Sequence, residues 1–117
     1  MFNFKKIIKS FHHAGRGLRQ VFHEEQNFRL QILAAAVVLS VAFYLGLKNW
    51  EIIILILMIT LVLVLELINS ILERLVDIVK PGIHEYARAI KDIMAAAVFI
   101  ASFSSLLVGI LIFLPYF

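Results

Sequence analysis

Three long stretches without a charged residue constrain the fold of this chain more than any other feature of its sequence. They cover Leu30–Leu47 with 18 residues, Ile52–Leu65 with 14 and Ile93–Phe117 with 25, and the second continues into a sparsely charged segment. A helix needs about 20 mostly apolar residues to cross the hydrocarbon core of a bilayer. The sequence therefore predicts an all-α integral membrane protein with three transmembrane helices, at about 28–48, 51–79 and 89–115.

Composition narrows the class of protein further. The chain has 117 residues, of which 62% are hydrophobic, and it has no cysteine, which excludes disulfides and thiolate chemistry. Its net charge of +3 comes from basic residues beside the apolar stretches. There the expected partners are anionic lipid headgroups rather than nucleic acid. We therefore expect a single membrane domain over residues 1–117 that contacts the lipid bilayer and no nucleic acid.

The first 25 residues mix apolar and basic positions in the pattern of an amphipathic helix. We expect this helix, at about 2–25, to lie on the membrane surface. The segment has no apolar core and no cleavage site of the signal-peptide type, so we expect it in the mature protein. Its apolar residues are Phe2, Phe4, Ile7, Ile8, Phe11, Leu18, Val21 and Phe22, and its basic residues are Lys5, Lys6, Lys9, Arg16 and Arg19.

Basic residues are distributed unequally between the ends of the predicted spans. Six Lys or Arg precede Leu30 and four lie between Arg74 and Lys91, whereas Lys48 alone lies between the first two spans. Cytoplasmic segments of membrane proteins carry an excess of Lys and Arg. The sequence therefore predicts a cytoplasmic amino terminus, a cytoplasmic 74–91 segment and a carboxyl terminus on the outer side.

Polar side chains share one helix face at the end of the second predicted span. At about 100° per residue, positions 66, 69, 73 and 77 fall at roughly 0°, 300°, 340° and 20°. Carboxylates within a membrane segment cost on the order of 2.5 to 3.5 kcal/mol each, so they usually line a functional cavity. The stripe of Glu66, Asn69, Glu73 and Asp77 therefore predicts a cation-binding site.

The residues of this stripe lie at different depths in the membrane. If Ile52 marks the outer edge, Glu66 lies roughly 21 Å into a hydrocarbon core of about 30 Å, at about 1.5 Å per residue. At the same rise per residue, Glu73 lies at a depth of about 31 Å and Asp77 at about 37 Å. The stripe therefore runs from the acyl region out to the cytoplasmic interface.

The residue types favour magnesium and a phosphorylated partner. The chain has no phosphate-binding loop motif and no zinc-binding helix motif, and its four His residues include no i, i+4 pair. Carboxylates favour Mg²⁺, which bridges one or two of them to substrate phosphates. In phosphoryl transfer, Glu25 and Glu73 would hold the metal and Lys91 would contact phosphate. Glu66, which lies deeper, would accept a proton from a lipid hydroxyl.

A second interpretation is a non-enzymatic cation-binding or cation-conducting membrane oligomer in which the stripe lines a pore. A pore stripe should continue across the membrane. The 14 residues of Ile52–Leu65 offer only Thr60 as a polar side chain. The sequence therefore argues against this alternative.

The polar stripe and its surroundings resemble the small prokaryotic diacylglycerol kinase and undecaprenol kinase family, over nearly the whole chain and without gaps. The matching motifs are Glu66-x-x-Asn69-Ser70-x-x-Glu73-x-x-x-Asp77, His84, Ala89-x-Lys91-Asp92 with Ala95 to Val98, and upstream Phe4-x-x-Ile7-Ile8-Lys9, Gly17-Leu18-Arg19 and Glu25-x-x-Phe28-Arg29.

The resemblance implies a lipid kinase that transfers the γ-phosphate of ATP, with Mg²⁺ as cofactor, to the hydroxyl of a membrane lipid alcohol. It implies a homotrimer of three-span subunits with active sites shared between neighbours. It also implies a place in phospholipid biosynthesis at the bacterial inner (cytoplasmic) membrane, with the active site on the cytoplasmic side. Diacylglycerol and undecaprenol both remain open as the substrate.

The resemblance also implies a role for each site residue. Glu25 and Glu73 would hold the ATP-bound Mg²⁺, Glu66 would be the proton acceptor, and Asn69 and Asp77 would support the site. The nucleotide contacts would be Lys6, His13, Gly82, Ile83, His84, Lys91 and Asp92, together with the two metal ligands. Lys6 and His13 differ in type from the Arg and Tyr of the family's best-known members.

Overall fold

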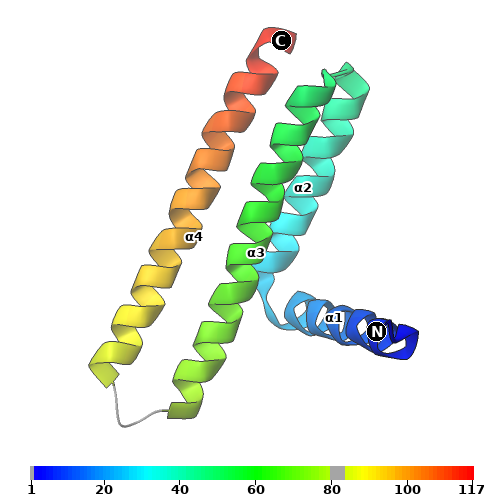
Figure 1. Cartoon of the computed structure of the whole chain (residues 1–117). Helices are drawn as coiled ribbons and strands as arrows, with labels where there is room; N and C mark the ends of the chain where they lie inside the picture. The colour runs from blue at the N-terminus through cyan, green and yellow to red at the C-terminus, as the bar shows by residue number, and fades with distance from the viewer. Residues whose placement is uncertain (1, 80–83) are drawn as a thin grey trace.

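The computed structural model describes residues 2–79 and 84–117, and these residues form helices joined by short connections (Figure 1). Helix α1 covers Phe4–Glu24, α2 covers Gln26–Leu45, α3 covers Asn49–Val79 and α4 covers His84–Phe113. A 3-10 turn, η1, follows at Leu114–Tyr116. Helices α2 and α3 and the segment Glu85–Tyr116 are long and apolar enough to cross a membrane, which confirms the three predicted spanning segments.

Helices α2, α3 and α4 form a bundle from which α1 departs. Helix α3 lies against both α4 and α2, and its contacts with α4 are the more extensive. Figure 1 shows α1 leaving the side of the bundle at a steep angle, with its amino-terminal end far from the other helices. Helices α3 and α4 continue beyond the level at which α1 joins. The bundle therefore has a protruding end, where α3 stops at Val79 and α4 starts at His84, and a C-terminal end, where η1 lies.

Local sequence signals set several of the helix boundaries. The Asn3 side chain accepts a hydrogen bond from the Lys6 N–H at 3.3 Å and so caps the start of α1. Helix α2 ends at Leu45 and is capped by Gly46, whose φ of 71° is in the left-handed region that glycine adopts at low cost. The expected turn around Pro81 and Gly82 lies outside the described residues.

The main buried cluster lies at the C-terminal end of the bundle. It contains Ala42 from α2, Leu47 from the α2–α3 connection, Leu55 from α3 and Ile112 from α4. Many other large apolar side chains of these helices are exposed. Such a surface suits contact with lipid tails or with other subunits.

Polar groups also close the C-terminal end. The side chain of Glu51, which is buried, accepts a hydrogen bond from the Lys48 N–H at 2.9 Å and another from the Tyr116 hydroxyl. The first of these bonds caps the start of α3. The second fastens η1 to the α2–α3 connection.

Candidate active site

A one-residue elbow places Glu25 against α3. Glu25 lies between α1 and α2 with extended backbone angles, φ −111° and ψ 110°, and its N–H donates to the Val21 carbonyl at 2.8 Å. Its Oε1 accepts a hydrogen bond from the Ser70 hydroxyl at 3.4 Å. The carboxylate that the sequence places 45 positions from Ser70 is therefore brought onto the polar face of α3.

This contact brings three carboxylates together, which we call the carboxylate cluster: Glu25, Glu66 and Glu73. Ser70 is four residues from Glu66 and three from Glu73, or about 6 Å and 4.5 Å along the helix axis. Both Glu25 and Glu73 are close enough to Glu66 to act on its charge. Glu25 therefore meets α3 at a level between the other two members.

Burial differs along the cluster. Glu66 and Ser70 are each only 2% exposed, whereas Glu25, Asn69 and Glu73 are half-buried. The Asn69 amide donates to Glu73 Oε1 at 3.3 Å and so orients that carboxylate. The polar face that the sequence predicted therefore runs from a closed end at Glu66 to an open end at Glu73.

One turn further toward the protruding end, Asp77 and Lys91 join α3 to α4. Lys91 Nζ lies 3.3 Å from Asp77 Oδ1, and both groups are partly exposed. Asp92, the next residue on α4, is exposed. The structure thus adds a cationic group beyond the open end of the carboxylate cluster.

Other predicted site residues lie apart from this group. Lys6 and His13 are exposed on α1, and Figure 1 shows the first turns of that helix pointing away from the bundle. Within one chain the structure does not bring them to the cluster. Gly82 and Ile83 lie outside the described residues. His84 is described only as the first residue of α4.

The structure reveals contacts that the sequence patterns did not predict. Arg74 forms an ion pair with Glu24, and Arg29 Nη1 donates to the carbonyls of Phe22 and His23, each at 2.8 Å. Ser70 could have been found, because it falls at roughly 40° on the helical projection that grouped the carboxylates. The two arginine contacts carry no such signal, since their partners all lie in α1, a different helix from either arginine.

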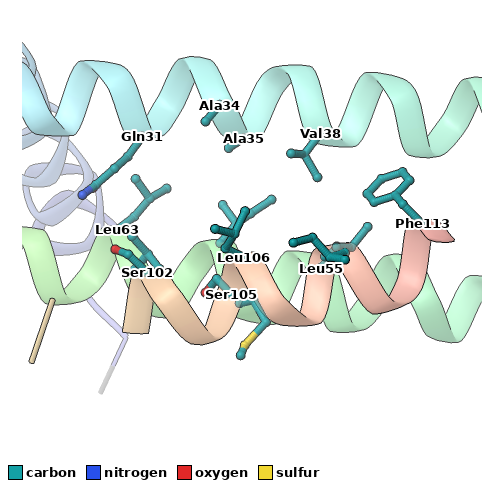
Figure 2. A pocket seen from close by; sticks show the side chains of 15 residues that line it. Gln31, Ala34, Ala35, Val38, Leu55, Leu63, Ser102, Ser105, Leu106 and Phe113 are labelled. Atoms are coloured by element: carbon teal, nitrogen blue, oxygen red, sulfur yellow. The ribbon is translucent and has the colours of Figure 1, made fainter. Parts of the chain in front are cut away.

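An elongated apolar cavity ends beside the cluster. It has a volume of about 440 Å³ and lies between α2, α3 and α4. Figure 2 shows Gln31 at one end and Phe113 at the other. The Gln31 side chain lies beside the Glu66 carboxylate, and its Oε1 is buried and has no hydrogen-bond partner among the described residues. Gln31 is therefore the polar residue at the junction of cavity and cluster.

The donor set fits magnesium rather than a metal held by protein alone. Within residues 2–79 and 84–117, no group of three or more His, Cys, Asp or Glu is arranged to bind a metal ion by itself. Mg²⁺ commonly uses one or two carboxylates and completes its shell with water and substrate phosphates. The half-buried Glu25 and Glu73 match that requirement.

Comparison with known proteins identifies the family. A profile of the family described as prokaryotic diacylglycerol kinase matches residues 12–113. The chain is 39% identical over 110 residues to the undecaprenol kinase of Bacillus subtilis, across 94% of this chain and 89% of that protein. It is 34% identical to a diacylglycerol kinase of Synechocystis, across 93% of this chain and 63% of that relative. It is 37% identical to a diacylglycerol kinase of Haemophilus influenzae, across 81% of this chain and 80% of that relative. The chain therefore belongs to the prokaryotic diacylglycerol kinase family of lipid kinases.

Proposed function

We propose that this membrane lipid kinase transfers the γ-phosphate of Mg-ATP to the hydroxyl of diacylglycerol or undecaprenol, and that the carboxylate cluster is its active site. The observation that carries the proposal is the meeting of Glu25 with α3 between Glu66 and Glu73. Three carboxylates gathered within an apolar helix bundle are costly unless they bind a cation or move a proton. The family relationship favours a kinase over the cation-conducting alternative.

The exposed residues of α1 support a position for the site at the membrane surface. Phe4, Ile7 and Phe11 are exposed on this helix, as are its basic residues. An amphipathic helix on the cytoplasmic membrane surface would place the apolar side chains in the lipid and the basic side chains among the headgroups. With α1 at the interface, Ser70 lies at about the same level and Glu66 about 6 Å deeper. Glu73 then lies near the water from which the nucleotide arrives, and Glu66 is buried at the depth of the lipid acyl chains. The protein acts in the bacterial inner membrane with this site on the cytoplasmic side.

Magnesium would be held by Glu25 and Glu73 together with the nucleotide phosphates. When bound, the metal neutralises charge that develops on the phosphate oxygens. Asn69 keeps the Glu73 carboxylate oriented through its 3.3 Å hydrogen bond. Lys91, with Asp77 beside it, and Asp92 contact the nucleotide from α4.

The reacting hydroxyl is held on the other side of the cluster. The apolar cavity beside Gln31 gives the hydrocarbon chain of the substrate a place next to Glu66. Glu66 accepts the hydroxyl proton while the lipid oxygen bonds to the γ-phosphorus. The bond from the γ-phosphorus to the bridging oxygen breaks, and ADP leaves with the electron pair.

A homotrimer explains the residues that one chain leaves apart. Lys6 and His13 lie far along α1, so they reach a nucleotide most directly in the site of a neighbouring subunit. The exposed apolar faces of the long helices supply surface for such an assembly. Each active site would then combine the carboxylate cluster of one subunit with α1 residues of another.

Substitution of Glu73 tests the proposal. The parent enzyme should consume ATP only with Mg²⁺ and a lipid alcohol, and the rates on diacylglycerol and undecaprenol identify the substrate. Glu73→Gln should lower Mg²⁺ and Mg-ATP affinity by ten-fold or more while the protein folds and inserts normally, because removing a membrane carboxylate removes a burial cost. Glu85→Gln, at an exposed position on α4, is the matched control. Normal Mg-ATP binding by Glu73→Gln, or ATP consumption without lipid, would refute the assignment.

A further inference from the structure

Two consecutive residues at the α1–α2 elbow hold consecutive turns of α3. Glu24, the last residue of α1, pairs with Arg74, and Glu25 accepts the hydrogen bond from Ser70. Residues 70 and 74 are four apart, so their side chains lie one above the other on the same helix face. The two contacts together define both the height and the orientation of the elbow against α3.

A third contact stiffens the elbow from within. Arg29, in the first turn of α2, donates to the carbonyls of Phe22 and His23, which are in the last turn of α1. These carbonyls form the negative end of the helix, where a cation is favourable. Arg29 thereby ties α1 to α2 across the single extended residue between them, and the elbow meets α3 as one unit.

The register of this unit determines how far Glu25 lies from Glu73. Glu25 is held to α3 by one hydrogen bond of 3.4 Å, which is long for a hydroxyl donor. Carboxylate oxygens must lie about 2.1 Å from Mg²⁺, and that ion tolerates little distortion. A separate contact that keeps the elbow at the correct height therefore bears directly on metal binding.

We propose that the Glu24–Arg74 ion pair is a positioning device that sets the register of Glu25 against Glu73 and thereby lowers the Mg²⁺ concentration the kinase requires. The inference rests on the proposed roles of Glu25 and Glu73. Neither Glu24 nor Arg74 touches the reacting atoms. The side chains of Arg74 and Glu24 are 43% and 52% exposed, so the pair adjusts the metal affinity without being essential for folding.

The test compares Glu24→Gln, Arg74→Gln and the double variant in purified full-length protein. Exposed ion pairs contribute modest free energies, so each single variant should raise the half-saturating Mg²⁺ concentration by about two- to five-fold. The maximal rate at saturating Mg²⁺ should stay close to the parent's. The double variant should resemble either single one, and exchange of the two residues, Glu24→Arg with Arg74→Glu, should restore part of the effect. Arg88→Gln, at an exposed position on α4, controls for loss of a cytoplasmic-side cation.

A second readout needs neither metal nor turnover. The chain has no cysteine, so spin labels can be attached through Cys at Gln20 on α1 and Ile78 on α3, both exposed. Diluting labelled with unlabelled protein isolates the distance within one chain. We expect a narrow distance distribution in the parent background and a broader one with Arg74→Gln or Glu24→Gln.

The outcomes separate this inference from the proposed function. If Arg74→Gln raises the KM for ATP while Glu24→Gln has no effect, Arg74 contacts nucleotide directly and the positioning role is wrong. An unchanged distance distribution in both variants would also overturn it. If Glu25→Gln and Glu73→Gln leave the required Mg²⁺ concentration unchanged, these residues do not bind the metal. The proposed function is then wrong, whatever the Glu24 and Arg74 variants show.

Discussion

Replacing Glu66 with Gln removes a charge and a proton acceptor while preserving the size of the side chain. Glu66 is 2% exposed, so bulk water is poorly placed to take over as acceptor. A positioned general base typically contributes about 10²- to 10⁴-fold to a rate. We therefore expect the turnover number of Glu66→Gln to fall by about 100-fold or more.

The same substitution should leave nucleotide binding intact. Glu66 lies about 10 Å from Glu73 along α3, too far for one Mg²⁺ to contact both directly. Mg-ATP carries a net negative charge, so neutralising a nearby carboxylate reduces repulsion. Mg-ATP affinity should be equal to that of the parent or higher, and the loss should appear in turnover alone.

The assay follows phosphorylation of diacylglycerol and undecaprenol beside Mg-ATP binding on the same purified variant. Thr60→Val, at an exposed position of the same helix, shows the effect of removing a polar group from the span without touching the cluster. A Glu66→Gln turnover within about ten-fold of the parent's on either lipid would remove Glu66 as the base. A change in oligomer stability with normal turnover would instead assign Glu66 a packing role between helices.

Other positions give independent tests. For topology, single Cys residues introduced at positions 48, 82 and 117 are probed in intact cells with a membrane-impermeant thiol reagent. The Cys residues at positions 48 and 117 should react, and the one at position 82 should not. The reverse pattern would refute the proposed sidedness. Gly46→Ala should destabilise the protein by about 1 to 2 kcal/mol in reversible detergent unfolding, because a residue with Cβ resists a φ of 71° although nothing lies within 4 Å of the added atom; an unchanged stability would contradict the left-handed cap. Tyr116→Phe should also destabilise the bundle, since it removes a hydroxyl donor from the buried Glu51, whereas Tyr44→Phe at an 89% exposed position should not; equal effects of the two would argue against that contact.

The sequence predicted the features that depend on local pattern. Uncharged stretches predicted the three spanning helices, because the cost of charge in a bilayer leaves a direct mark on composition. Helical periodicity grouped Glu66 and Glu73 on one face of α3. The structure adds Glu25, which lies between α1 and α2, to this group. The spacing of residues within one helix is fixed by its geometry, so this part of the site could be predicted without a structure.

Contacts between distant segments could not be predicted in the same way. Tyr116 and Glu51 are 65 positions apart, and Glu24 and Arg74 are 50 apart. Either Glu could equally have faced water or a lipid headgroup, since no periodicity links residues in separate helices. Gln31 also gave no local signal, because its buried oxygen is recognisable only when α2, α3 and α4 are assembled around the cavity.

The single extended residue between α1 and α2 limits how the length of this chain can change in evolution. Inserting or deleting one residue beside Glu25 would shift the backbone by about 3.8 Å and turn one helix by about 100° relative to the other. Phe28, which is 2% exposed, would leave its buried position, and Arg29 would lose the carbonyls of α1. Length differences between related chains should therefore accumulate before Phe4, where α1 projects away from the bundle, and be absent from the elbow.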